Sequence, residues 1–198
     1  ENQSSPIGEL ENTYSKTSNY KIGFTKYHKN SYINFIIENF NMNYGIPPSL
    51  EGHINGVDIE LIKNTFQINY HQDFSFYNFN QFDFKYNLID YQHEEFENNS
   101  LSAQVFLSKK THNFKIKFQS FNSIVGSELS YNQFLPDGLY YTPNTEELDF
   151  SLYGFYEKEF HHFELLSSFR VGYLSIQPDT SSIQNIISSL HIEEIKNR

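Results

Sequence analysis

Residues 81–95 read QFDFKYNLIDYQHEE, and this stretch decides the fold class. Four large apolar or aromatic side chains alternate there with three polar ones: Phe82, Phe84, Tyr86 and Leu88 against Asp83, Lys85 and Asn87. A period of two is typical of a β-strand with one apolar and one polar face. At about 3.3 Å per residue this strand reaches more than about 40 Å, whereas soluble strands usually have about 5–6 residues. A tilted strand that crosses a bilayer and projects beyond it needs about this length.

The composition favours a barrel wall over a packed globule. Hydrophobic residues make up 38% of the 198 residues, below the roughly 45–50% of ordinary soluble domains. Aromatic residues make up 18%, with 20 Phe and 15 Tyr but no Trp. In a membrane barrel, half of each strand faces water and aromatic side chains gather at the membrane interfaces. An AT-rich genome would also enrich Phe and Tyr, so composition alone leaves both readings open.

Charge and motifs exclude several function classes. The net charge of −10 argues against nucleic acid, which needs a basic face. The chain has no cysteine, which excludes disulfides, thiolate metal sites and a cysteine nucleophile. The sequence contains no run of about 18 apolar residues, so it predicts no transmembrane helix. We find neither a nucleophile elbow nor a glycine-rich phosphate loop, and therefore expect no enzyme activity.

The remaining alternation predicts an all-β protein, a long antiparallel meander of about nine strands. The predicted strands are residues 7–14, 20–27, 31–44, 57–71, 81–95, 101–108, 113–122, 147–157 and 163–174. Residues 15–19 and 109–112 are predicted as turns, and residues 124–145 as a long irregular segment because they contain Gly126, Pro136, Gly138 and Pro143. The tail, residues 181–198, fits either a strand or a helix.

The predicted connections alternate in length. Short turns are expected at residues 28–30, 73–80, 109–112 and 158–162, and longer connections at 45–56, 94–100, 124–145 and beyond 175. Short turns on one rim and long loops on the other are typical of outer-membrane barrels. The alternatives are a self-contained small outer-membrane barrel and a soluble β-sandwich that acts as a binding module.

Several short motifs resemble the zinc-type TonB-dependent outer-membrane receptors. NYGIP at residues 43–47 ends a predicted strand before a loop, as in that family. Four further stretches are similar in order and rough spacing: GELENT at residues 8–13, DYQHEE at 90–95, GSE at 126–128 followed by Pro143, and FYE at 155–157 with FEL at 163–165 and Arg170. Together they cover nearly the whole chain.

The resemblance implies that residues 1–198 are a partial receptor barrel domain. Such barrels have about 22 strands around a plug, and here the plug is missing. The family implies a bacterial outer membrane, surrounding lipid, uptake of a metal ion or metal chelate, and coupling to TonB through the plug. No resident cofactor is expected, and zinc is the candidate transported ligand. The chain begins at Glu1 without a start methionine or signal peptide, so we expect a fragment.

His93 and Glu95 are the strongest candidate metal ligands. They lie two apart on a predicted strand, so they share its polar face. Zinc needs about 3–4 ligands of this kind, and the others would come from the missing plug or from the loop that holds Glu51 and His53. That loop is poorer in His and acidic residues than the family pattern. The alternative is a solvated strand end with ordinary polar residues.

Overall fold

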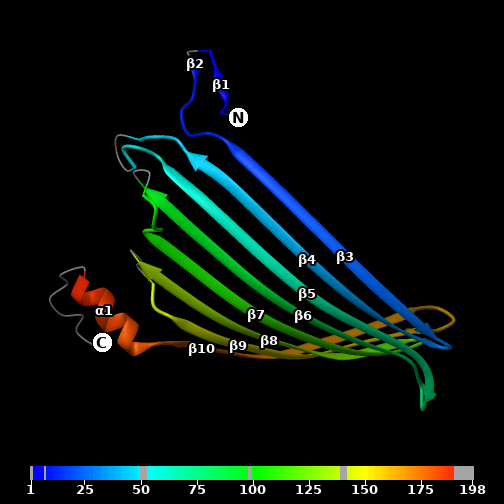
Figure 1. Cartoon of the computed structure of the whole chain (residues 1–198). Helices are drawn as coiled ribbons and strands as arrows, with labels where there is room; N and C mark the ends of the chain where they lie inside the picture. Colours follow the sequence, from blue (N-terminus) through cyan, green and yellow to red (C-terminus); the bar gives the residue numbers. More distant parts are fainter. Residues whose placement is uncertain (1, 7, 50–52, 98–99, 139–141, 190–198) are drawn as a thin grey trace.

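The computed structural model describes residues 2–6, 8–49, 53–97, 100–138 and 142–189. Eight long strands form one antiparallel sheet (Figure 1). They are β3 (Ser15–His28), β4 (Ser31–Ile46), β5 (Val57–Phe76), β6 (Phe79–Glu97), β7 (Val105–Ser120), β8 (Ser123–Gly138), β9 (Thr145–Glu159) and β10 (Glu164–Pro178). A small hairpin of β1 (Ser4–Ser5) and β2 (Gly8–Glu9) precedes the sheet, and helix α1 (Thr180–Ser189) follows it.

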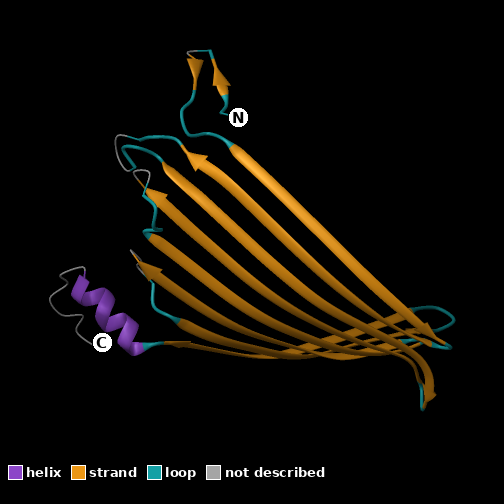
Figure 2. Ribbon diagram, viewed as in Figure 1, coloured by secondary structure: helices purple, strands orange, loops and turns teal. Residues whose placement is uncertain are grey.

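The sheet is a simple meander in which each strand pairs with its neighbours in sequence. This confirms the prediction of an all-β antiparallel meander. Figures 1 and 2 show a twisted, curled sheet that stays open, since β3 and β10 each have a partner on one side only. Its strands are long; β6, for example, has 19 residues. Among the described residues, no helix is both long enough and apolar enough to cross a membrane.

The sheet holds eight strands, where the sequence predicted about nine. Of the strand predicted at residues 7–14, residues 8–14 are described, and within them only Gly8–Glu9 pairs, in the separate β1–β2 hairpin. Residues 15–19, predicted as a turn, begin β3 and pair with β4. In the tail, which fitted either a strand or a helix, Thr180–Ser189 forms α1, and residues 190–198 lie outside the described residues.

The predicted hairpin over residues 109–112 is wrong, because β7 runs through them without a break. The four residues Lys-Lys-Thr-His are polar, which suggested a turn, but none of them is Gly, Pro or Asn. The alternation also stays in phase across them, since Phe106 and Phe114 lie on the same parity. Lys109 and Lys110 instead pair with Tyr91 and Asp90 in β6. The actual turn follows at residues 121–122.

The predicted irregular segment at 124–145 is also wrong over most of its length, because Ser123–Gly138 is strand β8. Two residues misled the sequence interpretation. Gly126 lies inside the strand, where the ring of Tyr153 occupies the space that a side chain would fill. Pro136 lies beyond Phe134, the last residue of β8 that pairs with β9, so its missing N–H costs no hydrogen bond to that strand.

The connections are sorted between two rims. One rim, which we call the short rim, holds the turns at residues 29–30, 77–78, 121–122 and 160–163. The other, the long rim, holds the connections at 47–56, 98–104 and 139–144. The predicted alternation is therefore present, with the turn at 121–122 in place of 109–112. The β1–β2 hairpin and α1 also lie at the long rim (Figure 1).

The sheet has two unlike faces. The belt face carries a row of apolar or aromatic residues to which every strand contributes: Phe24, Phe35, Ile68, Tyr86, Phe114, Leu129, Phe150 and Tyr173. The rows on either side are also mainly apolar, and together these rows form the apolar belt. The opposite face, which we call the polar face, carries Asp83, Lys85 and Asn87 in β6 and Asn113, Lys115 and Lys117 in β7.

The protein has almost no hydrophobic core. Val57 and Ile59 are the only hydrophobic residues that are buried within the described part of the chain. Belt residues are open to the surroundings: Phe114 is 37% exposed, Phe24 62% and Phe169 57%. A β-sandwich would bury such side chains between two sheets, but in the described residues the strands outside the eight-stranded sheet are those of the short β1–β2 hairpin. The described residues therefore do not form a β-sandwich.

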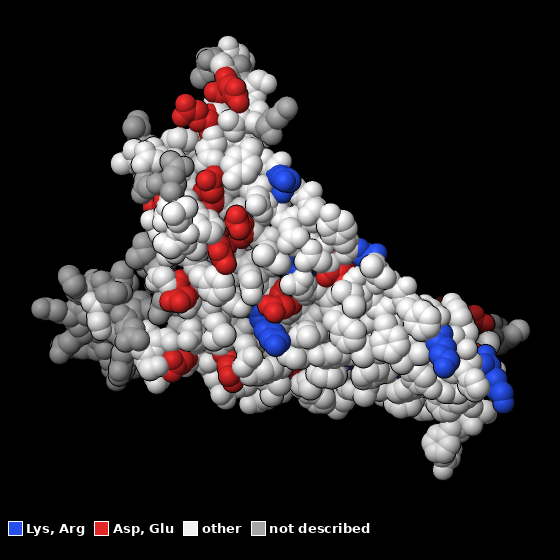
Figure 3. All heavy atoms as spheres, in the orientation of Figure 1, with Lys and Arg blue, Asp and Glu red and all other residues white. Residues whose placement is uncertain are grey.

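On the side shown in Figure 3 most of the surface is uncharged. Acidic groups are more numerous toward the long rim, and the basic groups are scattered, some at the short rim and others beside acidic groups farther along the sheet. On β6 the belt ends after Leu88, and Asp90, Gln92 and Glu94 continue the same face toward the long rim. The strands thus extend beyond the apolar belt at the end that carries the long connections.

Candidate functional site

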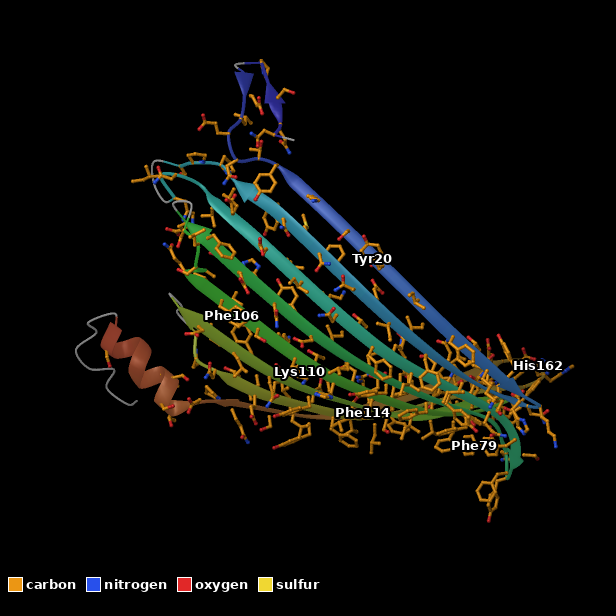
Figure 4. The ribbon with its side chains drawn as sticks, in the orientation of Figure 1. Tyr20, Phe79, Phe106, Lys110, Phe114 and His162 are labelled. Carbon is orange, nitrogen blue, oxygen red and sulfur yellow. The ribbon has the colours of Figure 1, made fainter. Side chains whose placement is uncertain are left out.

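Two groups of polar side chains on the polar face are candidates for function. One lies at mid-sheet, level with the apolar belt, and the other lies near the long rim. The registers of the strands position both, because residues that pair directly across an antiparallel ladder point to the same face. Figure 4 shows the side chains along the strands, with Lys110 and Phe114 of β7 labelled.

The mid-sheet group, which we call the mid-sheet network, consists of two neighbouring ion-pair clusters whose side chains come from five strands. Asp83 accepts from Lys117 Nζ at 2.9 Å, and its other oxygen lies 2.7 Å from His71 Nδ1. Glu128 pairs with Lys115 Nζ at 2.6 Å and with Arg170 Nη2 at 2.9 Å. These side chains come from β5, β6, β7, β8 and β10.

Arg170 also contacts two uncharged groups, a serine hydroxyl and a tyrosine ring. Its Nη2 donates to Ser151 Oγ at 2.8 Å, and its guanidinium lies 6.0 Å from the ring centre of Tyr153. Lys115 Nζ lies 5.5 Å from the same ring. The aromatic ring and Glu128 therefore hold two cations close together on the polar face.

Two hollows open on the polar face around this network. The first has a volume of about 290 Å³, and its polar lining includes Lys115, Glu128, Asp149 and Arg170. The second has a volume of about 690 Å³ and includes Asp83, Lys115 and Lys117. Lys85 lines both of them. Within the described residues Lys85 makes no ion pair, so its ammonium group is open to the hollows.

Near the long rim lie the residues that the sequence singled out as metal ligands. His93 Nε2 lies 2.9 Å from Glu95 Oε1, which confirms that the two share a face and contact each other. The His93 side chain is 14% exposed, because its cross-strand neighbours are Leu61 and Leu107. Its Nδ1 lies 3.5 Å from the Tyr91 hydroxyl.

His53 does not join that pair. Its Nδ1 lies 2.7 Å from Glu97 Oε1, so the long rim carries two separate His–Glu pairs instead of one cluster. Glu51 lies outside the described residues. In the described part of the chain, no group of three or more His, Asp or Glu side chains is arranged so that it could hold a metal ion. The two pairs thus offer two protein ligands each, fewer than the roughly 3–4 of a closed zinc site.

A polar anchor holds the start of β3 to the long rim. The Asn12 amide donates to the carbonyl oxygens of Ile46 and Val57, both at 3.0 Å. The Tyr14 hydroxyl donates to Asp58 Oδ1 at 3.0 Å. Burial, reinforced by this hydrogen bond to Asp58, raises the pKa of the Tyr14 hydroxyl above its ordinary value. The chain is therefore fixed where it enters the sheet, beside the connection that carries His53.

Sequence reasoning found the rim pair but missed the mid-sheet network and Glu97. His93 and Glu95 were identifiable because parity alone brings residues i and i+2 to one face. The signal for the network was the charged alternation of Asp83 with Lys85 and of Lys115 with Lys117. Its meaning depended on the register between strands, which pairs Lys117 with Asp83 and Lys115 with Glu128.

Compared with known proteins, the chain matches no protein-family model, and no curated protein matches it.

Proposed function

We propose that this sheet is a stretch of the wall of a transmembrane β-barrel in a bacterial outer membrane. The belt face is turned to lipid and the polar face to an aqueous lumen. The single observation that carries the proposal is the apolar belt, to which all eight strands contribute in a sheet that has almost no core. Lipid is the covering that suits a continuous apolar belt on one face and charged groups on the other.

The energetics support a covering for the belt. Removing a large apolar side chain from water is worth about 1.5–3 kcal/mol. The belt repeats such side chains along every strand, so leaving it in water would forgo tens of kcal/mol. From Phe82 to Leu88 the belt measures about 20 Å along the strand, close to the roughly 25 Å apolar band of outer-membrane barrels.

The belt also crosses the strands obliquely. In β3 the belt is centred on Ile22. The residues that pair with Ile22 from strand to strand across the sheet end at Ser175 in β10. In β10 itself the exposed apolar residues Phe169, Val171 and Tyr173 are centred on Val171, four residues away from Ser175. A band level with a membrane must slide along the strands in this way when the strands are tilted, and closure into a barrel requires tilt.

We further propose that this wall belongs to a TonB-dependent receptor that takes up a metal ion, zinc being the candidate, or a metal chelate. The motif resemblance supports this, beginning with NYGIP at residues 43–47. The two His–Glu pairs add support, because they lie at the long rim, where an incoming ligand would first meet the proposed barrel. Transport would then depend on a plug coupled to the inner-membrane energy system.

Cysteine labelling in vesicles tests the membrane wall. The chain has no cysteine, so each introduced thiol is unique. Asn113→Cys and Phe114→Cys are neighbours in β7 on opposite faces. In phospholipid vesicles we expect a water-soluble maleimide to label Asn113→Cys and spare Phe114→Cys, whereas both react in denaturant. Equal labelling of the two in vesicles, or failure of the chain to associate with lipid, contradicts the proposal.

Zinc titration tests the ligand. His93→Gln removes one half of the partly buried His93–Glu95 pair, and we expect it to weaken zinc binding by the full chain at least about tenfold. His162→Gln is the matched control, because His162 lies in the turn at the opposite rim. Equal zinc affinity for His93→Gln and the unmodified chain would remove zinc from the proposal.

A further inference from the structure

We infer that the polar face carries an oxyanion-binding subsite at mid-sheet, centred on Lys85 and Lys115, which takes a carboxylate or phosphate group. This rests on the proposed function in one respect only: the polar face is taken as the lumen wall. It deepens that function, because it makes the cargo an anion or a metal complex that bears free oxyanion groups.

The first observation is that two lysines oppose each other directly. Lys85 of β6 pairs with Lys115 of β7, so both ammonium groups leave the same face from backbones about 5 Å apart. Like charges in this position destabilise a sheet. Lys117 follows on the same face of β7, two residues further along. Lys85 and Lys115 thus form a like-charge pair, whereas Lys117 is directly opposite Asp83.

The second observation is that the nearby carboxylates leave one of these cations unpaired. Glu128 serves Lys115 and Arg170, and Asp83 serves Lys117 and His71. The two hollows together are lined by four cations and three carboxylates, in a chain whose net charge is −10. The local excess is positive although the protein is acidic, and Lys85 carries it.

The third observation is that the surroundings suit an oxyanion. Asn87, Asn113 and Ser130 line the first hollow beside Lys85 and offer amide and hydroxyl donors. A carboxylate or phosphate between Lys85 and Lys115 would neutralise their repulsion and accept from these donors.

The depth of the subsite gives it a role. Lys85 lies between Phe84 and Tyr86, which belong to the apolar belt on the opposite face. In the proposed barrel the subsite is therefore at membrane depth, below the long rim. A ligand that entered past the rim pairs would next meet this cationic stretch of wall, which favours anions and repels a bare divalent cation.

Binding of two probes to the full chain in detergent micelles tests the subsite. Inorganic phosphate and citrate are titrated by calorimetry. We expect saturable binding by the unmodified chain, at least about tenfold weaker binding by Lys85→Gln, and affinity within about threefold for Lys85→Arg, which keeps the charge. Tighter binding of citrate identifies a carboxylate ligand, and tighter binding of phosphate a phosphate ligand.

Lys26→Gln is the matched control, since it removes one lysine charge from the belt face of β3 and should bind like the unmodified chain. Circular dichroism of each variant checks that the sheet is intact. Absence of saturable binding by the unmodified chain, or equal binding by Lys85→Gln, overturns the subsite. Lys85-dependent binding by a chain that does not associate with vesicles would instead remove the membrane proposal and leave the subsite standing.

Discussion

At the scale of single residues, aromatic rings and small side chains complement each other across strands. Gly154 in β9 pairs with Phe169 in β10, and the ring of Phe169 lies where a Gly154 side chain would be. Gly126 in β8 stands in the same relation to Tyr153 in β9. Each ring covers the backbone of a glycine that would otherwise weaken its strand. These glycines are therefore packing positions within the strands.

We predict that Gly154→Ala destabilises the protein by about 1–3 kcal/mol, because the added methyl group overlaps the Phe169 ring. The measurement is the urea midpoint of unfolding in micelles. Gly172→Ala is the control, since its new Cβ meets only ordinary contacts at 3.5 Å and 3.8 Å. Equal midpoints for the two variants would show that the ring does not occupy this space.

Residue chemistry also explains which site features were predictable. His93 and Glu95 needed only strand parity, and the structure brings them together. His53 and Glu97 lie 44 positions apart in sequence, so their contact depends on how a loop folds back on the rim. Lys85 was visible as a charged residue on a strand, but its lack of a carboxylate partner depends on which residues its neighbours in β7 and β8 engage.

At the scale of elements, the alternation of apolar and polar residues predicts a strand well where the alternation continues from one end of the strand to the other. It identified β4, β5, β6, β9 and β10 with boundaries shifted by a few residues. It failed in β7 because four polar residues resemble a turn, although they are the part of that strand beyond the belt. It failed in β8 because Gly126 and Pro136 are residue types common in loops. Here Gly126 packs against the Tyr153 ring, and Pro136 lies where β8 pairs with β7 but no longer with β9.

A proline substitution tests whether residues 109–112 form a turn, as the sequence predicted, or part of strand β7, as in the structure. Thr111 lies in mid-strand and pairs with Ile89 and Asn132, so Thr111→Pro removes a ladder donor and should prevent the sheet from forming. His161→Pro places proline at the second position of the turn at 160–163, where proline is favoured. Circular dichroism should show lost strand signal for the first variant only. A folded Thr111→Pro variant would restore the hairpin prediction.

Helix α1 begins at a capping residue with a strongly perturbed pKa. Asp179 accepts hydrogen bonds from the backbone amides of Ser181 and Ser182, both at 3.2 Å, and from both of their hydroxyls. These hydrogen bonds, led by the one from the Ser181 hydroxyl, lower the pKa of Asp179 to about 2. A carboxylate at this position satisfies amides that the first turn of a helix leaves unpaired.

The depressed pKa sets the pH range in which the cap acts. Its stabilising contribution is complete above the unfolded value of about 3.9 and is lost as the pH falls through about 2. We predict that the NMR shift of the Ser182 amide titrates with a midpoint near pH 2, and that Asp179→Asn abolishes the titration. A midpoint near pH 4 would show that the carboxylate does not cap the helix.

At the scale of the whole molecule, the protein is a single curved layer with two open edges. Layers of this kind are completed by pairing at the edges and by covering the apolar face. In the proposed membrane setting lipid covers the belt, and the open edges of β3 and β10 require strand partners, because unpaired backbone groups are costly in hydrocarbon. In that proposed setting an aqueous lumen would solvate the charges on the polar face.

A nitroxide scan of β6 in lipid vesicles tests the central claim most directly. Single cysteines from Phe82 to Phe96 are spin-labelled, and the accessibility of each to oxygen and to a water-soluble nickel complex is measured. We predict that oxygen accessibility alternates with period two from Phe82 to Leu88, high on the belt face, and that positions on that face from Asp90 onward become accessible to nickel. Nickel access to Phe84 and Tyr86 as high as to Asp83 and Lys85 would show that the belt does not face lipid.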